Sequence, residues 1–119
     1  MSEDYRQLTI FDWIPEQNEL DDIPEETMVE RIGAAIGVKF KKDGKFRDWE
    51  AKIGKITISL QYEYYAEGVF DGKKHIGVDV NATHDGCGST CDSIGEAIDY
   101  LRYAIPHIQD CIDRRRNNE

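Results

Sequence analysis

Hydrophobic residues recur at every third or fourth position between Asp22 and Gly37, which is the spacing of one face of a helix. Asp22 suits the N-cap of that helix, and Pro24 suits an early position in it. Gly37 supplies the left-handed stop. The spacing predicts a helix whose inward face carries Met28, Val29, Ile32, Ala35 and Ile36.

Apolar and polar residues then alternate, which predicts strands with one buried face. The cleanest alternation runs from Lys55 to Tyr65 and points Ile56, Ile58, Leu60, Tyr62 and Tyr64 inward. Shorter alternations predict strands around Val38 and Phe40, over residues 46–53 and over residues 75–82. Because only one face is apolar, we expect an antiparallel sheet with one face in water.

A second helical spacing closes the chain. Residues 83–92, with Gly86, Gly88 and two cysteines, are expected to form a loop before it. Ser93 and Glu96 have the form of a capping box. Pro106 is expected to kink or end the helix after about Ile105. The inward stripe consists of Ile94, Ile98, Leu101, Ile105, Ile108 and Ile112.

These elements predict one α+β domain over residues 22–116. Its antiparallel sheet has three to four strands, flanked on one face by an N-terminal and a C-terminal helix in the order α-β-β-β-α. Residues 1–21 show no sustained period and are expected to form an acidic arm that is disordered when alone.

The net charge of −9 is concentrated at the start of the chain. Residues 1–30 hold ten acids and one base, whereas the rest of the chain holds fourteen of each. We detect no apolar run of about 20 residues that could span a bilayer and no signal-peptide pattern. With an odd count of three cysteines, this predicts a cytoplasmic protein without membrane contact.

The most specific short motif is Gln7-Leu8-Thr9-Ile10-Phe11. It resembles the bacterial sliding-clamp-binding peptide, whose pattern is Gln-Leu-(Ser or Asp)-Leu-Phe. The resemblance covers five residues and implies that Leu8, Ile10 and Phe11 fill an apolar groove while Gln7 bonds at its rim. Trp13 is a further candidate contact. The alternative is that this segment folds back onto its own domain.

The opening segment, residues 50–55 and residues 91–97 are also similar to segments of small, uncharacterised phage and mobile-element proteins of Gram-positive bacteria. Our leading hypothesis is therefore a non-enzymatic interaction protein that docks on the host sliding clamp. The alternative is an acidic inhibitor of a host nucleic-acid enzyme, such as an anti-CRISPR or anti-restriction protein that mimics DNA. Its candidate decoy residues are Asp12, Glu16, Glu19, Asp21, Asp22, Glu25 and Glu26.

A lysine-rich span between Lys39 and Lys55 contains Phe40, Phe46 and Trp49, which could serve nucleic-acid stacking. The element order is similar to that of a double-stranded RNA-binding domain. That family places lysines at the start of its second helix, where this chain has Asp92 and Glu96. Direct nucleic-acid binding is therefore not expected, and the lysines are interpreted as the wet side of a sheet.

Thiol and metal chemistry receives little support from the residue spacing. His84, Cys87, Cys91 and Cys111 lack the paired ligand spacing of a structural zinc site, although whether His84, Cys87 and Cys91 bind metal stays open. Cys91 precedes a helix, yet no third group that would orient a catalytic pair with His84 or His107 is visible. We expect no cofactor and no catalytic residue.

Overall fold

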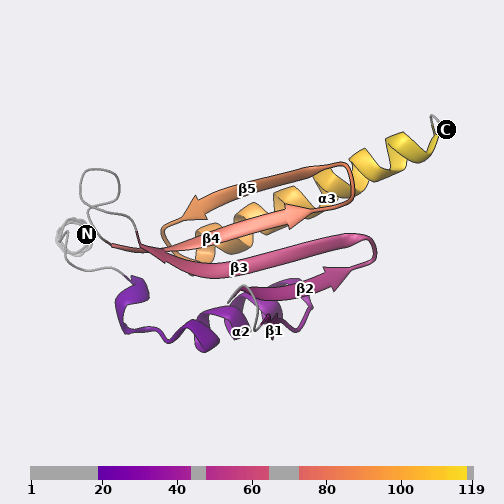
Figure 1. The fold of residues 1–119 in the computed structure, drawn as a ribbon. Coiled ribbons are helices and arrows are strands. Elements are labelled where there is room, and N and C mark those ends of the chain that lie inside the picture. Colours follow the sequence, from indigo (N-terminus) through magenta and orange to yellow (C-terminus); the bar gives the residue numbers. More distant parts are fainter. Residues whose placement is uncertain (1–18, 44–47, 65–72, 118–119) are drawn as a thin grey trace, which may run out of the picture.

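A computed structural model describes residues 19–43, 48–64 and 73–117 of the chain (Figure 1). It confirms the α+β class, with five strands in the described residues instead of the three to four expected. The order is η1 (Glu19–Asp22), α2 (Glu25–Ile36), β1 (Lys41–Lys42), β2 (Trp49–Ile53), β3 (Ile56–Tyr64), β4 (Lys74–Asn81), β5 (Gly86–Cys91) and α3 (Ile94–Asn117).

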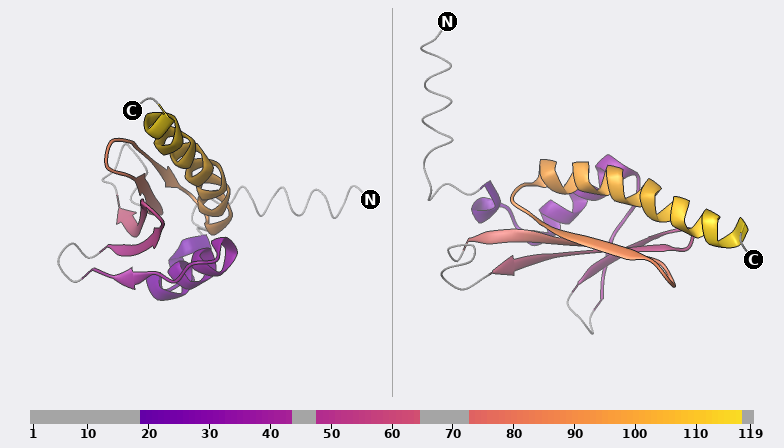
Figure 2. Two further views of the ribbon diagram at one scale, coloured as in Figure 1. Left: turned by 90° about the vertical axis from the view of Figure 1, so that its right-hand side faces the viewer. Right: turned by 90° about the horizontal axis from the view of Figure 1, so that it is seen from above.

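The sheet is an antiparallel meander in which each strand pairs with its neighbours in the chain, β1-β2-β3-β4-β5. At its centre Ile58 of β3 pairs with Ala51 of β2 and with Val80 of β4. Both α2 and α3 lie on the same face of the sheet (Figure 2). The register therefore places the alternating apolar side chains of three strands under the helices, as the sequence pattern predicted.

The core lies between that sheet face and the two helices. Its largest side chains with less than 2% of their surface exposed are Leu20, Met28, Ile32, Ile56, Ile58, Leu60, Ile76, Leu101, Ile108, Val78 and Val80. The expected stripe on α3 is confirmed, with Ile94, Leu101 and Ile108 buried and the other three isoleucines packed against the core. None of the helices in the described ranges is both long and apolar enough to span a bilayer.

The segment over residues 83–92, expected as a loop, contains strand β5. This strand has few apolar side chains, because Gly86, Gly88 and Ser89 make up half of it. All three are exposed. They become a strand through backbone pairing with β4 from Asn81↔Gly86 to Ile76↔Cys91. The pattern of apolar and polar residues does not reveal such a strand, because the strand is stabilised by backbone hydrogen bonds to β4 rather than by its own side chains.

The first helix begins later than expected. Asp22 ends the short η1 helix, and α2 starts after Pro24, whose ψ of 147° places it outside the helix as the N-cap. Leu20, assigned to the arm by the sequence pattern, has no exposed surface and belongs to the core. The expected stop is confirmed, because Gly37 has the left-handed φ of 80°.

The last helix continues through Pro106 to Asn117, so the expectation that it could end after about Ile105 is wrong. Proline removes one backbone donor inside a helix, which normally costs about 3 kcal/mol. Here Ala104 and Ile108 are buried on either side of it, so packing on the sheet holds both halves in one helix. The Ser93 half of the predicted capping box forms, because Glu96 N donates to Ser93 Oγ at 3.1 Å. The Glu96 side chain reaches one residue further back and accepts from Asp92 N at 2.6 Å.

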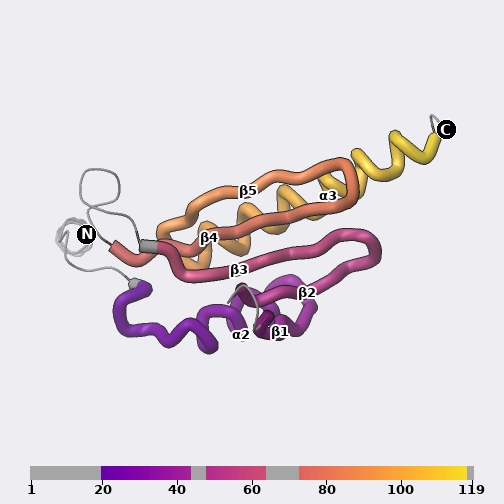
Figure 3. The backbone as a smooth tube through the Cα atoms, viewed as in Figure 1, coloured from indigo at the N-terminus to yellow at the C-terminus, as the bar shows by residue number. Residues whose placement is uncertain are grey.

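The two ends of the sheet are formed by different parts of the chain (Figure 3). Element η1 lies at one end. The β2–β3 turn and the β4–β5 turn lie at the other, together with the last turn of α3. The N-terminal arm therefore joins the described body at the end opposite to these two turns.

Candidate functional site

The proposed clamp-binding residues Gln7, Leu8, Ile10, Phe11 and Trp13 lie outside the described residues. The same is true of Asp12 and Glu16 from the candidate decoy set. The candidate sites described below lie within residues 19–43, 48–64 and 73–117.

Of the remaining candidate decoy residues, Glu19 lies in η1, while Asp21, Asp22 and Glu26 are exposed. Glu25 is different, because its carboxylate is engaged inside the fold. It accepts a hydrogen bond from the Trp49 indole Nε1 at 3.2 Å and another from the Tyr62 backbone N at 2.9 Å. Glu25 thus joins α2 to two strands rather than facing a partner.

Three further contacts complete this junction. The Tyr62 hydroxyl donates to the Ile23 carbonyl oxygen at 2.7 Å. Lys42 Nζ lies 3.8 Å from Glu25 Oε1 and 5.5 Å from the centre of the Trp49 ring. Neither Trp49 nor the buried Phe40 is therefore a free stacking platform, which removes two of the three aromatic residues from the nucleic-acid surface that we considered.

The sheet face that the helices leave open is polar throughout its described strands. Its side chains alternate with those that face the helices in the register of all five strands. No large apolar side chain stands among these positions. They are Lys41, Glu50, Lys52, Thr57, Ser59, Gln61, Glu63, His75, Gly77, Asp79, Asn81, Gly86, Gly88 and Thr90.

Carboxylates concentrate on this open face. Asp48, just before β2, has its pKa raised, first by burial and then by the charge of Asp79, with smaller effects from Asp43, Glu25 and Glu63. The Glu63 carboxylate accepts hydrogen bonds from Thr90 Oγ1 and Gln61 Nε2, both at 3.3 Å. The face thus gathers negative charge on folded strands, whereas the candidate decoy residues named from the sequence all lie between Asp12 and Glu26.

A histidine–carboxylate contact also lies at one end of this face. His75 Nδ1 lies 2.7 Å from Asp92 Oδ1, and only 5% of His75 is exposed. The sequence reasoning missed this pair because it depends on β4–β5 pairing, which brings the start of one strand beside the end of the other.

The cysteines do not form a thiol centre with the histidines. Cys91 is buried and Cys87 is half-buried on β5, whereas His84 is exposed in the β4–β5 turn. Burial raises the pKa of the Cys91 thiol, which opposes formation of the nucleophilic thiolate. Within the described ranges no three His, Cys, Asp or Glu residues are placed to hold a metal ion.

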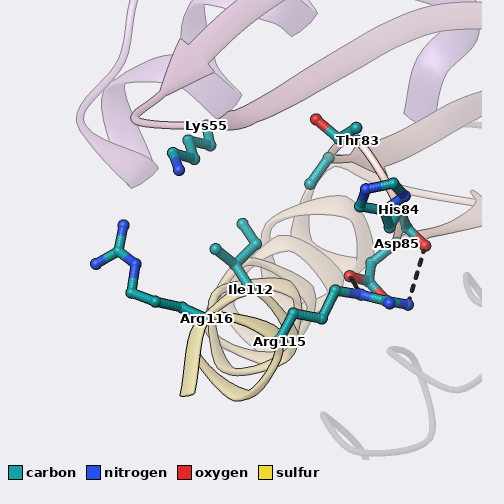
Figure 4. Close-up of a pocket in the computed structure, with 8 residues that line it drawn as sticks. Lys55, Thr83, His84, Asp85, Ile112, Arg115 and Arg116 are labelled. Atoms are coloured by element: carbon teal, nitrogen blue, oxygen red, sulfur yellow. Dashed lines mark hydrogen bonds and ion pairs between the residues drawn. The ribbon is translucent and has the colours of Figure 1, made fainter. Parts of the chain in front are cut away.

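The end of the molecule opposite η1 contains a hollow of about 240 Å³ (Figure 4). The β2–β3 turn contributes Lys55, the β4–β5 turn contributes Thr83 and His84, and the last turns of α3 contribute Ile112 and Arg116. Sequence reasoning missed this site. The run Arg114-Arg115-Arg116 at the end of α3 was an available signal, but its neighbours come from two distant turns.

One wall of this hollow is fixed by an arginine–aspartate pair. Arg115 Nε lies 2.8 Å from Asp85 Oδ2, and Arg115 Nη2 lies 3.2 Å from Asp85 Oδ1. This two-point hydrogen bond lowers the pKa of Asp85 and raises that of Arg115. The pair ties the end of α3 to the β4–β5 turn.

A second hollow, of about 450 Å³, lies beside β1 and β2 and collects the lysines of the basic span. Lys39, Lys41, Lys42 and Lys52 line it together with Asp43 and Glu50. Since Lys42 also contacts Glu25, the positive charge there is offset by nearby carboxylates. This supports the interpretation of the lysines as a solvated sheet edge.

No protein-family model matches this chain, and neither the curated proteins nor the solved structures that were compared with it include a significant match. Its function must therefore be argued from its own residues.

Proposed function

We propose that this protein is a non-enzymatic interaction protein that docks on the bacterial sliding clamp through residues 7–11. The observation that carries the proposal is the order Gln7-Leu8-Thr9-Ile10-Phe11, which resembles the clamp-binding peptide. An extended peptide with apolar side chains and one amide suits an apolar groove with a polar rim.

The surface of the described body supports this assignment. Its only large hydrophobic residue that is strongly exposed is Tyr103, which is 62% exposed and stacks on His107 with 5.6 Å between ring centres. The open sheet face carries polar side chains and glycines. The described body therefore offers few exposed apolar side chains to an apolar groove on a partner. The sequence of residues 8–14 contains five large apolar residues.

Calorimetric titration of the full-length chain into purified clamp tests the proposal. Wild type is expected to bind, and Leu8→Ala combined with Phe11→Ala is expected to abolish measurable binding because both pocket-filling side chains are lost. Tyr103→Ala is the control, since it removes an exposed aromatic ring from α3 and leaves the motif intact. Equal binding by the double variant and wild type would refute clamp docking through this motif.

A second candidate function is inhibition of a host nucleic-acid enzyme, and the carboxylates on the open sheet face favour it. Glu50, Glu63 and Asp79 lie on strands and Asp48 directly precedes β2, so they present negative charge in a fixed arrangement to a basic cleft. In this case Glu50→Gln with Asp79→Asn should weaken enzyme inhibition, and added salt should weaken it further. Undiminished inhibition by that variant would exclude mimicry by this face.

A further inference from the structure

The hollow at the end opposite η1 is lined by Lys55, Arg115 and Arg116 but, among the described residues, by one carboxylate, that of Asp85. Figure 4 shows the Lys55 and Arg116 side chains on the same side of the hollow, with the Ile112 side chain beside them. Neither cation forms an ion pair within the described ranges, because the nearby carboxylate of Asp85 is bound to Arg115. Two like charges thus face one space without an internal counter-ion.

The other groups around the hollow suit a small anion with an uncharged part. Thr83 offers a hydroxyl and His84 an imidazole, both from the exposed β4–β5 turn. Ile112 and Ala82 provide an apolar floor. The volume of about 240 Å³ lies below the roughly 300–1,000 Å³ of drug-sized ligand sites, so the occupant is a small group or one end of a larger molecule.

We propose that this pocket binds a phosphate group, held between Lys55 and Arg116. A terminal phosphate, with three acceptor oxygens and close to two negative charges, matches two cations that form no ion pair within the described ranges. A carboxylate carries one negative charge, and a nucleic-acid backbone would need two successive phosphodiesters to supply two. Guanidinium and ammonium groups are also the side chains that most often bind phosphate oxygens.

The helix end does not cancel this charge. The C-terminus of a helix carries about −0.5 elementary charge, which repels anions. The last turn of α3 contains Arg114, Arg115 and Arg116, whose charges exceed that of the helix end. Arg114 lies 3.0 Å from Asp110 and Arg115 is held by Asp85, whereas Arg116 lines the hollow and forms no ion pair within the described ranges.

Titration of inorganic phosphate into the isotope-labelled full-length chain, at constant ionic strength, tests the site by amide chemical shifts. Saturable shifts are expected at residues 55, 82–85 and 112–116. Lys55→Ala with Arg116→Ala should weaken binding by about tenfold or more, because two charge-assisted contacts are lost. The matched control is Arg31→Ala with Lys52→Ala, which removes the same charge from exposed positions elsewhere. Lys55→Gln alone is a milder second variant.

A single-stranded thymidine oligonucleotide is the second probe and separates two sources of phosphate. Tighter binding of the oligonucleotide than of inorganic phosphate assigns the site to a nucleic-acid backbone, whereas equal binding assigns it to a small phosphorylated molecule. In both cases the pocket variants must bind less tightly than the control. Absence of saturable shifts with both probes, or equal weakening by the control variant, would overturn the proposal.

Discussion

At the scale of single residues, one close backbone approach limits which side chain the fold accepts. Gly33 of α2 is buried, and a Cβ there would lie 2.6 Å from the Val38 carbonyl oxygen and 3.3 Å from Phe40 Cδ2. We predict that Gly33→Ala lowers the free energy of unfolding by about 1–3 kcal/mol, because backbone must shift to admit the methyl group. Urea denaturation measures this change.

Gly95 in the first turn of α3 is the matched control. A Cβ there would meet only Ser93 Oγ at 3.8 Å, an ordinary contact. Gly95→Ala should therefore be neutral or stabilise by up to about 1 kcal/mol, the usual gain in a helix. Similar losses in both variants would show that the contact of Gly33 with Val38 is not decisive.

Asp48 provides a prediction about pH. Its pKa is raised in the folded protein, so the folded state holds this proton more tightly than the unfolded state does. The stability that protonation provides is present at low pH and is lost as pH rises through the folded pKa. Asp48→Asn should therefore stabilise the protein at pH 7 by about 0.5 kcal/mol, the size of a partly exposed charge interaction.

Denaturant unfolding of wild type and Asp48→Asn at pH 7 and pH 3.5 compares the two states of Asp48. The advantage of the variant should shrink at pH 3.5, because the raised pKa of Asp48 favours its uncharged form as the pH falls. A difference that stays constant between the two pH values would assign the effect to packing instead of charge.

At the scale of elements, the contact between α2 and the sheet depends on one carboxylate. Glu25 accepts hydrogen bonds from Trp49 of β2 and from the backbone of Tyr62 of β3. Glu25→Ala would leave both donors without this acceptor in a partly buried place, which should cost about 1–3 kcal/mol of stability. Thermal or urea unfolding checks this value.

The neighbouring exposed residue Glu26 is the control for that variant. Glu26→Ala removes the same charge from the same turn and should change stability by no more than about 0.5 kcal/mol. If both variants lose equal stability, the effect comes from charge at the start of α2 and not from the junction with the strands.

Elements differ in how far their own sequence specifies them. The alternation over β3 and the stripe on α3 were correctly predicted, because each element buries its own regularly spaced side chains. Strand β5 was missed because its glycines carry no such pattern. Helix α3 continues beyond Pro106 because buried residues on both sides of the proline pack on the sheet. In both cases a neighbouring element supplied the deciding free energy.

At the scale of the whole molecule, the two proposed binding sites belong to separate parts. The arm joins the body at η1, and the phosphate pocket lies at the opposite end of the sheet. We therefore predict that Lys55→Ala with Arg116→Ala leaves clamp affinity unchanged within about twofold, since neither residue belongs to the motif and sites without shared partners act independently.

The reciprocal measurement completes this prediction. Leu8→Ala with Phe11→Ala should leave phosphate-induced amide shifts at residues 82–85 unchanged. Loss of clamp binding in the pocket variant would instead indicate that both sites contact the same partner surface.

The amino-acid sequence by itself determined the α+β class, the inward faces of the main strands and helices, and the location of the excess negative charge. These properties depend on local spacing, which a chain carries before it folds. Only the tertiary structure decided the fifth strand, the role of Glu25, the His75–Asp92 contact and the cationic pocket. Each of these requires residues distant in sequence to meet, and strand pairing and helix docking settle which ones do.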